Sequence, residues 1–200
     1  MLDLITLKKK LRQDLRCRLG LLDERQILAR SGAVHERLFA TPWWSEARWV
    51  FVYIALPGEV DTGPVVIRAY REGRQVAIPR IEGEEIVFYR YEGRTRELIP
   101  NQFGILEPDP QWIPVDPLGL KDGPLLVLCP GLGFDRGLHR IGRGKGYYDR
   151  FLARLRAARL PFRAVGLAFA EQLAPEVPVG PHDQLLDGLI TDRELLSVEA

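Results

Sequence analysis

A ten-residue segment, Arg140 to Asp149, reads R-I-G-R-G-K-G-Y-Y-D and alternates glycines with basic side chains. Glycine lets backbone N–H groups approach an anion closely, while Arg140, Arg143 and Lys145 add positive charge. The segment leads into a predicted helix, whose N-terminal dipole also favours an anion. The residue types and their spacing therefore predict a polyphosphate-binding loop.

Three side chains at the end of this loop extend its possible chemistry. Tyr147 and Tyr148 can stack on a ring or donate hydroxyl hydrogen bonds, and Asp149 offers hard oxygen atoms suited to Mg²⁺ beside phosphates. Two alternatives stay open from the residues alone: a solvated turn for the glycine-rich core and a helix N-cap for Asp149. Known nucleotide-binding motifs do not settle these alternatives. The loop is not a Walker A sequence, because Lys145 is followed by Gly146 rather than by Ser or Thr.

The elements that must position the loop alternate between strands and helices. Apolar runs rich in β-branched and aromatic residues predict strands over 49–56, 75–81, 85–91, 125–135, 162–169 and 188–191. Apolar residues at helical spacing predict helices over 4–19, 23–38, 65–70 and 147–159. Segment 100–124, rich in Pro, Gly and Asp, is expected to cross the surface as an ordered loop.

This alternation predicts an α/β fold, a three-layer α/β/α sandwich with a mostly parallel central sheet. The length of 200 residues favours a single domain over residues 1–200. Ligands of open α/β sheets bind beyond the carboxyl ends of the strands, and residues 130–149 are expected to lie there.

Composition excludes several classes of protein. The formal net charge is +1, so no global field favours nucleic acid or a membrane surface. The sequence shows no secretory segment and no apolar run long enough to span a membrane, which predicts a cytoplasmic location. Cys17 and Cys129 are isolated, which argues against a disulfide framework or a zinc site and favours inert thiols.

The loop and its surroundings resemble the 5-formyltetrahydrofolate cyclo-ligase family, also called 5,10-methenyltetrahydrofolate synthetases. P-G-L-G-F-D followed by R-I-G-R-G-K-G-Y-Y-D-R-F-L carries the resemblance, and G-E-V-D-T, F-G-I-L-E-P at 103–108 and P-H-D-Q-L-L-D extend it over nearly the whole chain. One departure is Leu138, where the family usually has glycine. A differently shaped turn is therefore expected between Asp135 and His139.

The resemblance implies a set of site residues. The residues expected to bind ATP are Lys8, Arg12, Arg140, Ile141, Gly142, Arg143, Gly144, Lys145, Gly146, Tyr147 and Tyr148. Those expected to contact the folate are Arg12, Ile54, Glu59, Arg143, Gly144, Lys145, Gly146 and Tyr147. The expected catalytic residues are Arg143, Lys145 and Tyr147, and the expected Mg²⁺ ligands are Asp149 and Asp183, the latter preferred to Asp187.

Spacing alone supports the residues outside the loop less strongly. Lys8, Arg12 and Arg16 recur every four residues, and such a basic stripe is usually a solvated helix face. Glu59 follows the strand predicted over 49–56, where a carboxylate can accept hydrogen bonds from the N–H donors of a ring. An exposed turn acid is the alternative there.

The reaction that the resemblance implies is an ATP-dependent, Mg²⁺-assisted cyclisation of 5-formyltetrahydrofolate to 5,10-methenyltetrahydrofolate. ADP and phosphate would be released through a phosphorylated formyl (phospho-imidate) intermediate. The expected partners are small molecules, with no nucleic acid and no membrane, and a monomer is expected. The alternatives are another phosphate-binding α/β enzyme, such as a sugar-phosphate isomerase, and a basic nucleic-acid-binding module.

Overall fold

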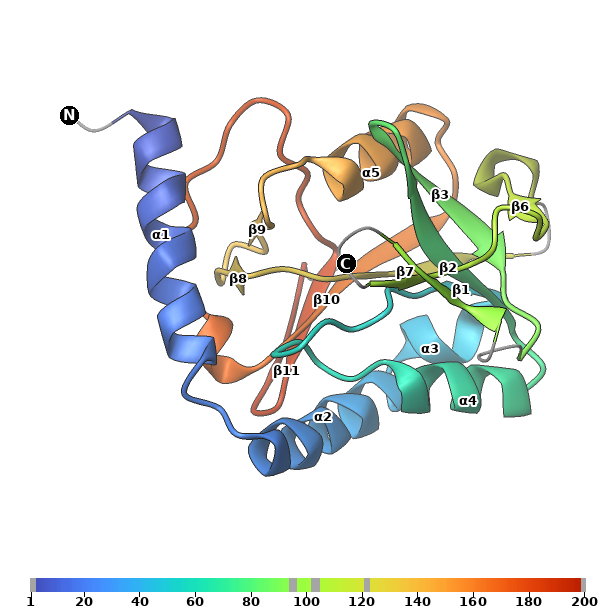
Figure 1. The fold of residues 1–200 in the computed structure, drawn as a ribbon, viewed down its shortest axis with the longest axis horizontal. Helices are drawn as coiled ribbons and strands as arrows, with labels where there is room; N and C mark the ends of the chain where they lie inside the picture. Colours follow the sequence, from blue (N-terminus) through green and yellow to red (C-terminus); the bar gives the residue numbers. More distant parts are fainter. Residues whose placement is uncertain (1–2, 94–96, 102–104, 121–122, 199–200) are drawn as a thin grey trace.

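A computed structural model describes residues 3–93, 97–101, 105–120 and 123–198 of the chain (Figure 1). The helices are α1 (Leu4–Leu19), α2 (Glu24–Phe39), α3 (Pro42–Glu46), α4 (Gly63–Arg71) and α5 (Tyr147–Ala157), with the 3-10 helices η2 (Pro117–Gly119) and η3 (Ala170–Gln172). The strands are β1 (Trp49–Phe51), β2 (Gln75–Glu82), β3 (Glu85–Arg90), β4 (Ile99–Pro100), β5 (Leu106–Glu107), β6 (Pro114–Val115), β7 (Leu125–Cys129), β8 (Gly133–Phe134), β9 (Arg140–Ile141), β10 (Phe162–Ala168), β11 (Gly188–Thr191) and β12 (Leu195–Ser197). Phe103 and Gly104 of the F-G-I-L-E-P motif lie outside the described residues.

Within those residues, the main sheet has eight strands in the order β12-β11-β10-β7-β1-β2-β3-β6. Neighbouring strands from β11 to β2 pair in parallel, and β12, β3 and β6 pair antiparallel at the two edges. Helix α5 covers one face of the sheet, and α2, α3 and α4 cover the other (Figure 1). The predicted three-layer sandwich with a mostly parallel sheet is confirmed, and burial on both faces explains why β1 and β7 are continuously apolar.

The first central strand is shorter than predicted, because β1 ends at Phe51 rather than continuing to residue 56. Beyond Phe51 the Val52 N–H still donates to the Ala77 carbonyl at 2.9 Å, and side-chain hydrogen bonds follow. The Tyr53 carbonyl accepts from the Thr62 hydroxyl at 2.6 Å, and the Tyr53 hydroxyl donates to the Val60 carbonyl at 3.1 Å. Residues 53–62 therefore form a loop that these two hydrogen bonds close, and this loop brings Glu59 back towards the end of the sheet.

Several other elements also differ from the predictions. The run 125–135 divides into β7 and β8, and Pro130 between them has no N–H for a strand ladder. Helix α5 ends at Ala157, two residues early, and Arg159 adopts a left-handed φ of 54°. The antiparallel edge strand β12 had no sequence signal strong enough to predict it.

Helix α1 matches its predicted bounds, but its leucine stripe is buried only towards its C-terminal end. Leu15 is fully buried in a small cluster with Ile141, Ala174 and Val177, whereas Leu4 and Leu7 are 37% and 38% exposed. The contact with Ile141 in β9 docks α1 beside the hairpin that leads into the glycine-rich loop.

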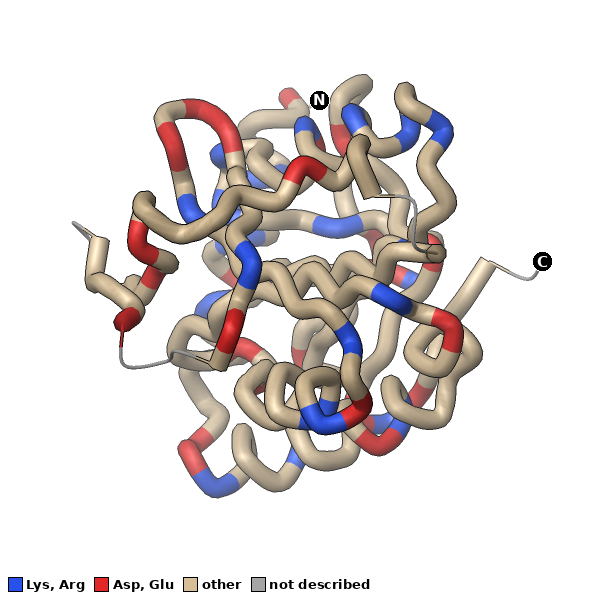
Figure 2. The backbone as a smooth tube through the Cα atoms, turned by 90° about the vertical axis from the view of Figure 1, so that its right-hand side faces the viewer, with Lys and Arg blue, Asp and Glu red and all other residues tan. Residues whose placement is uncertain are grey.

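Charged residues of both signs are interspersed along the backbone in the view of Figure 2. Among the helices that the structure describes, none combines the length and the apolar composition needed to cross a bilayer.

Two glycine-to-alanine substitutions are expected to change stability in opposite directions. A Cβ on Gly188 in β11 would lie 2.4 Å from Cη2 of Trp43, so Gly188→Ala should lower the free energy of unfolding by about 1–3 kcal/mol through overpacking. A Cβ on Gly32 in α2 meets no described atom within 4 Å, so Gly32→Ala should raise it by about 0.5–1 kcal/mol. Urea denaturation measures both, and equal changes in the two variants would contradict this packing.

Candidate active site

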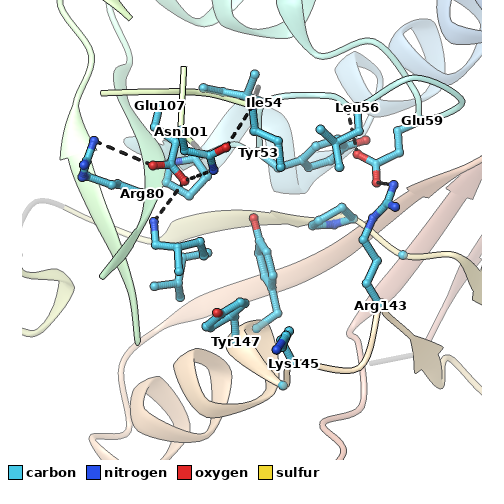
Figure 3. Close-up of a pocket in the computed structure, with 18 of the residues that line it drawn as sticks. Tyr53, Ile54, Leu56, Glu59, Arg80, Asn101, Glu107, Arg143, Lys145 and Tyr147 are labelled. Atoms are coloured by element: carbon cyan, nitrogen blue, oxygen red, sulfur yellow. Dashed lines mark hydrogen bonds and ion pairs between the residues drawn. The ribbon is translucent and has the colours of Figure 1, made fainter. Parts of the chain in front are cut away.

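A cavity of about 840 Å³ lies at the carboxyl ends of the parallel strands, where an α/β sheet is expected to bind ligands. Its walls come from the turn after β1, the second half of β2, the segment around β5, the bend after β7 and the glycine-rich loop. The lining residues predicted from the sequence are Ile54, Glu59, Arg140, Arg143, Gly144, Lys145, Gly146, Tyr147, Tyr148 and Asp149. Figure 3 shows Glu59 and Arg143 meeting at one end of this cavity.

The glycine-rich loop depends on two left-handed positions. Gly144 has φ 103° and Gly146 has φ 69°, and side-chain-bearing residues rarely adopt such values. Gly146 is also the N-cap of α5, so the helix begins directly at the cavity wall. Lys145 lies between these two glycines and Arg143 directly precedes Gly144, and both side chains are exposed. The loop thus presents cations and a helix N-terminus to one space, the arrangement expected for binding phosphates.

Arg140 holds the loop in place through the contacts of its buried guanidinium. Its guanidinium is buried, donates to Asp149 at 3.0 Å and to the Pro130 carbonyl at 3.2 Å, and lies 5.7 Å from the centre of the Tyr148 ring. Its Nε has no hydrogen-bond partner among the described residues. Arg140 therefore ties the start of α5 to the bend after β7 while keeping one donor unused.

Glu59 and Arg143 form an ion pair at one end of the cavity, with 3.3 Å between Arg143 Nη2 and Glu59 Oε1. The carboxylate also accepts from the Leu56 N–H at 3.1 Å. The Glu59 side chain is 11% exposed and the Arg143 side chain is 49% exposed. Burial raises the pKa of Glu59 more than the Leu56 N–H and Arg143 lower it, so its pKa lies above its ordinary value.

Removing the guanidinium is expected to raise the pKa of Glu59 further. In Arg143→Met the carboxylate keeps its burial and the Leu56 hydrogen bond but loses its positive partner, so its charged form becomes less favourable. The measurement is an NMR titration of the side-chain carboxyl carbon in both proteins. A Glu59 pKa that stays equal or falls in the variant would show that Arg143 does not pair with Glu59 in solution.

Two basic side chains of α1 fix the helix in place, Arg12 to the glycine-rich loop and Lys8 to Asp183 in the segment before β11. Lys8 forms an ion pair with Asp183, which also accepts from the Gly180 N–H at 2.7 Å, and Arg12 Nε donates to the Gly142 carbonyl at 2.9 Å. Burial raises the pKa of Asp183, but the hydrogen bonds from Lys8 and Gly180 outweigh it, so the pKa lies below its ordinary value. These contacts hold the basic stripe of α1 behind the loop.

The turn around Leu138 keeps a conformation that suits glycine. Leu138 has a left-handed φ of 64°, its N–H donates to the Asp135 carbonyl at 3.1 Å, and its carbonyl accepts from the Leu186 N–H at 3.1 Å. A left-handed residue with a side chain costs about 1–2 kcal/mol. Burial of the leucine side chain offsets part of that strain.

Comparison with known proteins assigns the chain to a family. Residues 5–192 match the model of the 5-formyltetrahydrofolate cyclo-ligase family. The chain belongs to this family of enzymes.

Individual relatives of the cyclo-ligase family cover nearly the same length. A Schizosaccharomyces pombe protein named as a probable 5-formyltetrahydrofolate cyclo-ligase is 30% identical over 94% of this chain and 97% of its own length. A Mus musculus 5-formyltetrahydrofolate cyclo-ligase is 28% identical, with 92% of each chain covered. The NMR structure of Aquifex aeolicus 5,10-methenyltetrahydrofolate synthetase superposes with a TM-score of 0.77 at 30% identity and covers 96% of this chain and 92% of that one. The resemblance read from the sequence is thus confirmed at the level of family and fold.

Five residues expected at the cyclo-ligase site lie outside the cavity lining: Lys8, Arg12, Ile141, Gly142 and Asp183. The first two contact the loop or its neighbours, as described above, and Ile141 is buried under α1. Their roles in binding stay predictions.

The two residues expected to hold Mg²⁺ lie in neighbouring segments, and each carboxylate pairs with a base, Asp149 with Arg140 and Asp183 with Lys8. Asp149 Oδ1 accepts from the Gln184 N–H at 3.2 Å, and Gln184 directly follows Asp183. Across the described ranges, no group of three or more His, Cys, Asp or Glu residues is placed to hold a metal. Two carboxylates completed by phosphate oxygens and water suit Mg²⁺, which seldom takes an all-protein cage. Asp149 and Asp183 are oxygen donors of the kind that Mg²⁺ takes, and their role as its ligands stays a prediction.

The sequence did not predict the polar end of the cavity opposite Glu59. Figure 3 shows Arg80, Asn101 and Glu107 there. The Glu107 side chain is only 6% exposed, accepts from Asn101 Nδ2 at 2.9 Å and from the Ile81 N–H at 3.4 Å, and lies 3.7 Å from Arg80. Segment 100–124 has no clear periodicity, so only the F-G-I-L-E-P motif, which contains Glu107, could have indicated this end.

Proposed function

We propose that this protein cyclises 5-formyltetrahydrofolate to 5,10-methenyltetrahydrofolate at the expense of ATP, within the cavity described above. The observation that carries the proposal is that one cavity joins a buried carboxylate, Glu59, to an exposed glycine and cation loop. The carboxylate suits the N–H donors of a pterin, and the loop suits a triphosphate. Membership of the cyclo-ligase family supports this pairing of ligands.

The proposed chemistry has two steps. The formyl oxygen attacks the γ-phosphorus, the bond to the bridging oxygen breaks, and ADP leaves. N10 of the same folate then attacks the formyl carbon and loses its proton to water. The carbon–oxygen bond breaks, and inorganic phosphate leaves as the five-membered ring closes. Nucleophile and electrophile belong to one substrate in the second step, so no protein nucleophile is required.

The protein's contribution is positioning and charge stabilisation. Lys145 and Arg143 would neutralise the transferring phosphoryl group, and Tyr147, half-buried in the cavity wall, would contact both substrates through its ring or hydroxyl. Asp149 and Asp183 would hold Mg²⁺, which when bound neutralises part of the phosphate charge. Arg140 would keep Asp149 oriented through their 3.0 Å ion pair.

The direct test mixes the protein with ATP, Mg²⁺ and 5-formyltetrahydrofolate and follows the absorbance of the methenyl product. Separate omission of ATP, Mg²⁺ and protein should each abolish the signal. A sugar-phosphate isomerase would need no ATP, and a nucleic-acid-binding module would show salt-dependent binding without turnover. Failure to form an ATP-dependent product would refute the proposed reaction. Size-exclusion chromatography with light scattering tests the predicted monomer, and the cytoplasmic location also stays a prediction.

A further inference from the structure

The hydroxyl group of Tyr148 is buried at the cavity wall without a hydrogen-bond partner among the residues that the structure describes. The residue as a whole is 9% exposed. A buried hydroxyl without a partner destabilises a folded protein, whereas a phenylalanine of nearly the same shape would avoid that loss. Tyr148 therefore carries a polar group that the free protein does not use.

The ring of Tyr148 is held in place by its neighbours. It lies on the buried face of α5, packs edge-on against Phe88 with 6.5 Å between ring centres, and has the Arg140 guanidinium 5.7 Å from its own centre. A tyrosine hydroxyl held in this way can donate one hydrogen bond to a ligand.

The Tyr148 side chain is buried in the cavity wall, whereas the cations expected to bind phosphate are exposed. Arg143 and Lys145 are exposed, as suits a triphosphate that keeps part of its hydration. Tyr148 belongs to a buried part of the wall that also contains Tyr53, Ile86 and Leu132. In this group the Tyr53 hydroxyl is already bonded to Val60, and a mostly apolar surface with one unused polar group is typical of a site for a flat ring whose edge carries hydrogen-bonding groups.

We propose that Tyr148 positions the folate rather than ATP, with its hydroxyl hydrogen-bonding a polar atom of the bound folate. This assignment rests on the proposed function. It differs from the role in ATP binding that the family resemblance implies for Tyr148.

The test is Tyr148→Phe, which removes only the hydroxyl. The dissociation constant and KM for 5-formyltetrahydrofolate should rise about tenfold, because one hydrogen bond in a buried site is lost. The dissociation constant and KM for ATP should stay unchanged. The melting temperature of the ligand-free variant should equal or exceed that of the wild type.

Tyr53→Phe is the matched comparison for stability, because the Tyr53 hydroxyl is also buried but donates to the Val60 carbonyl at 3.1 Å. That variant should melt at a lower temperature than the wild type. Comparison of the two variants thus distinguishes a hydroxyl that stabilises the fold from one that is available to a ligand.

Three outcomes would overturn the assignment of Tyr148. Unchanged folate affinity would show that the hydroxyl does not contact the folate, weaker ATP binding would assign it to the nucleotide, and a lower melting temperature would assign it to the fold. If the wild-type protein itself binds no 5-formyltetrahydrofolate, the proposed function fails and the Tyr148 assignment fails with it. Wild-type turnover with normal folate binding in Tyr148→Phe would leave the function standing and refute only the assignment.

Discussion

Lys145→Ala is expected to reduce turnover by roughly 100- to 1,000-fold while the protein remains folded. Lys145 lies between the two left-handed glycines of the loop, at the cavity wall and directly before α5 begins. Its ammonium would stabilise charge that develops on the transferring phosphoryl group, and such preorganised charge contributes much to phosphoryl transfer. Its side chain is exposed, so little packing is lost on its removal.

Initial rates of methenyl formation measure this effect, with circular dichroism and a melting curve to check folding. Lys10→Ala is the matched control, because Lys10 is an exposed lysine on α1 for which the structure gives no role in the cavity. It should change turnover less than twofold. Near-normal activity in a folded Lys145→Ala protein would remove the loop from the catalytic machinery.

Glu59→Gln is expected to weaken binding of 5-formyltetrahydrofolate by roughly 10- to 100-fold, because hydrogen bonds to a charged partner are worth about 1.5–3 kcal/mol. The substitution keeps the shape of the side chain and an acceptor oxygen but removes the negative charge that faces Arg143. In the proposed complex the same charge would accept hydrogen bonds from the ring donors of the folate. Binding of ATP should change much less. Titration calorimetry with each ligand measures the two affinities, and Glu36→Gln, an exposed acid on α2, serves as the control.

Glu59→Gln is also expected to change how the free energy of unfolding depends on pH. Because burial raises the pKa of Glu59 in the folded protein, the folded state holds its proton more tightly than the unfolded chain does. The free energy of unfolding of the wild type should therefore fall as pH rises from the ordinary carboxyl pKa to the raised one. Glu59→Gln has no carboxyl group at this position and does not lose stability in this way. The free energy of unfolding of the variant minus that of the wild type should therefore increase across that window and then become constant. A difference that does not change with pH would contradict a raised pKa.

Local features of the chain were predictable because they depend on neighbours in sequence. Leucines at helical spacing predicted the bounds of α1, and the capping box that begins at Asp23 shows why α2 starts where it does. The loop of Arg140 to Asp149 was recognisable because glycines and cations at short range need no tertiary information to indicate an anion site. The order of alternating elements also sufficed for the layered fold, since few topologies satisfy it.

Features that depend on distant residues were not predictable in this way. Nothing in the local sequence of 53–62 shows that the chain turns back through the Tyr53 and Thr62 hydrogen bond, which shortens β1 and carries Glu59 to Arg143. The pairing of Glu107 with Asn101 and Arg80 likewise joins a surface segment without periodicity to β2. Such contacts arise from packing, which single-sequence patterns do not encode.

The sequence by itself determined the family, the layered α/β architecture and a loop able to hold phosphates, because each follows from residue types at fixed spacing. Only the tertiary structure decided which side chains share the cavity with that loop. It sets Glu59 against Arg143, leaves Lys8 and Asp183 behind the loop, and turns the Tyr148 hydroxyl inwards without a described partner. Burial and through-space distance decide these relations, and both exist only once segments far apart in the chain have packed together.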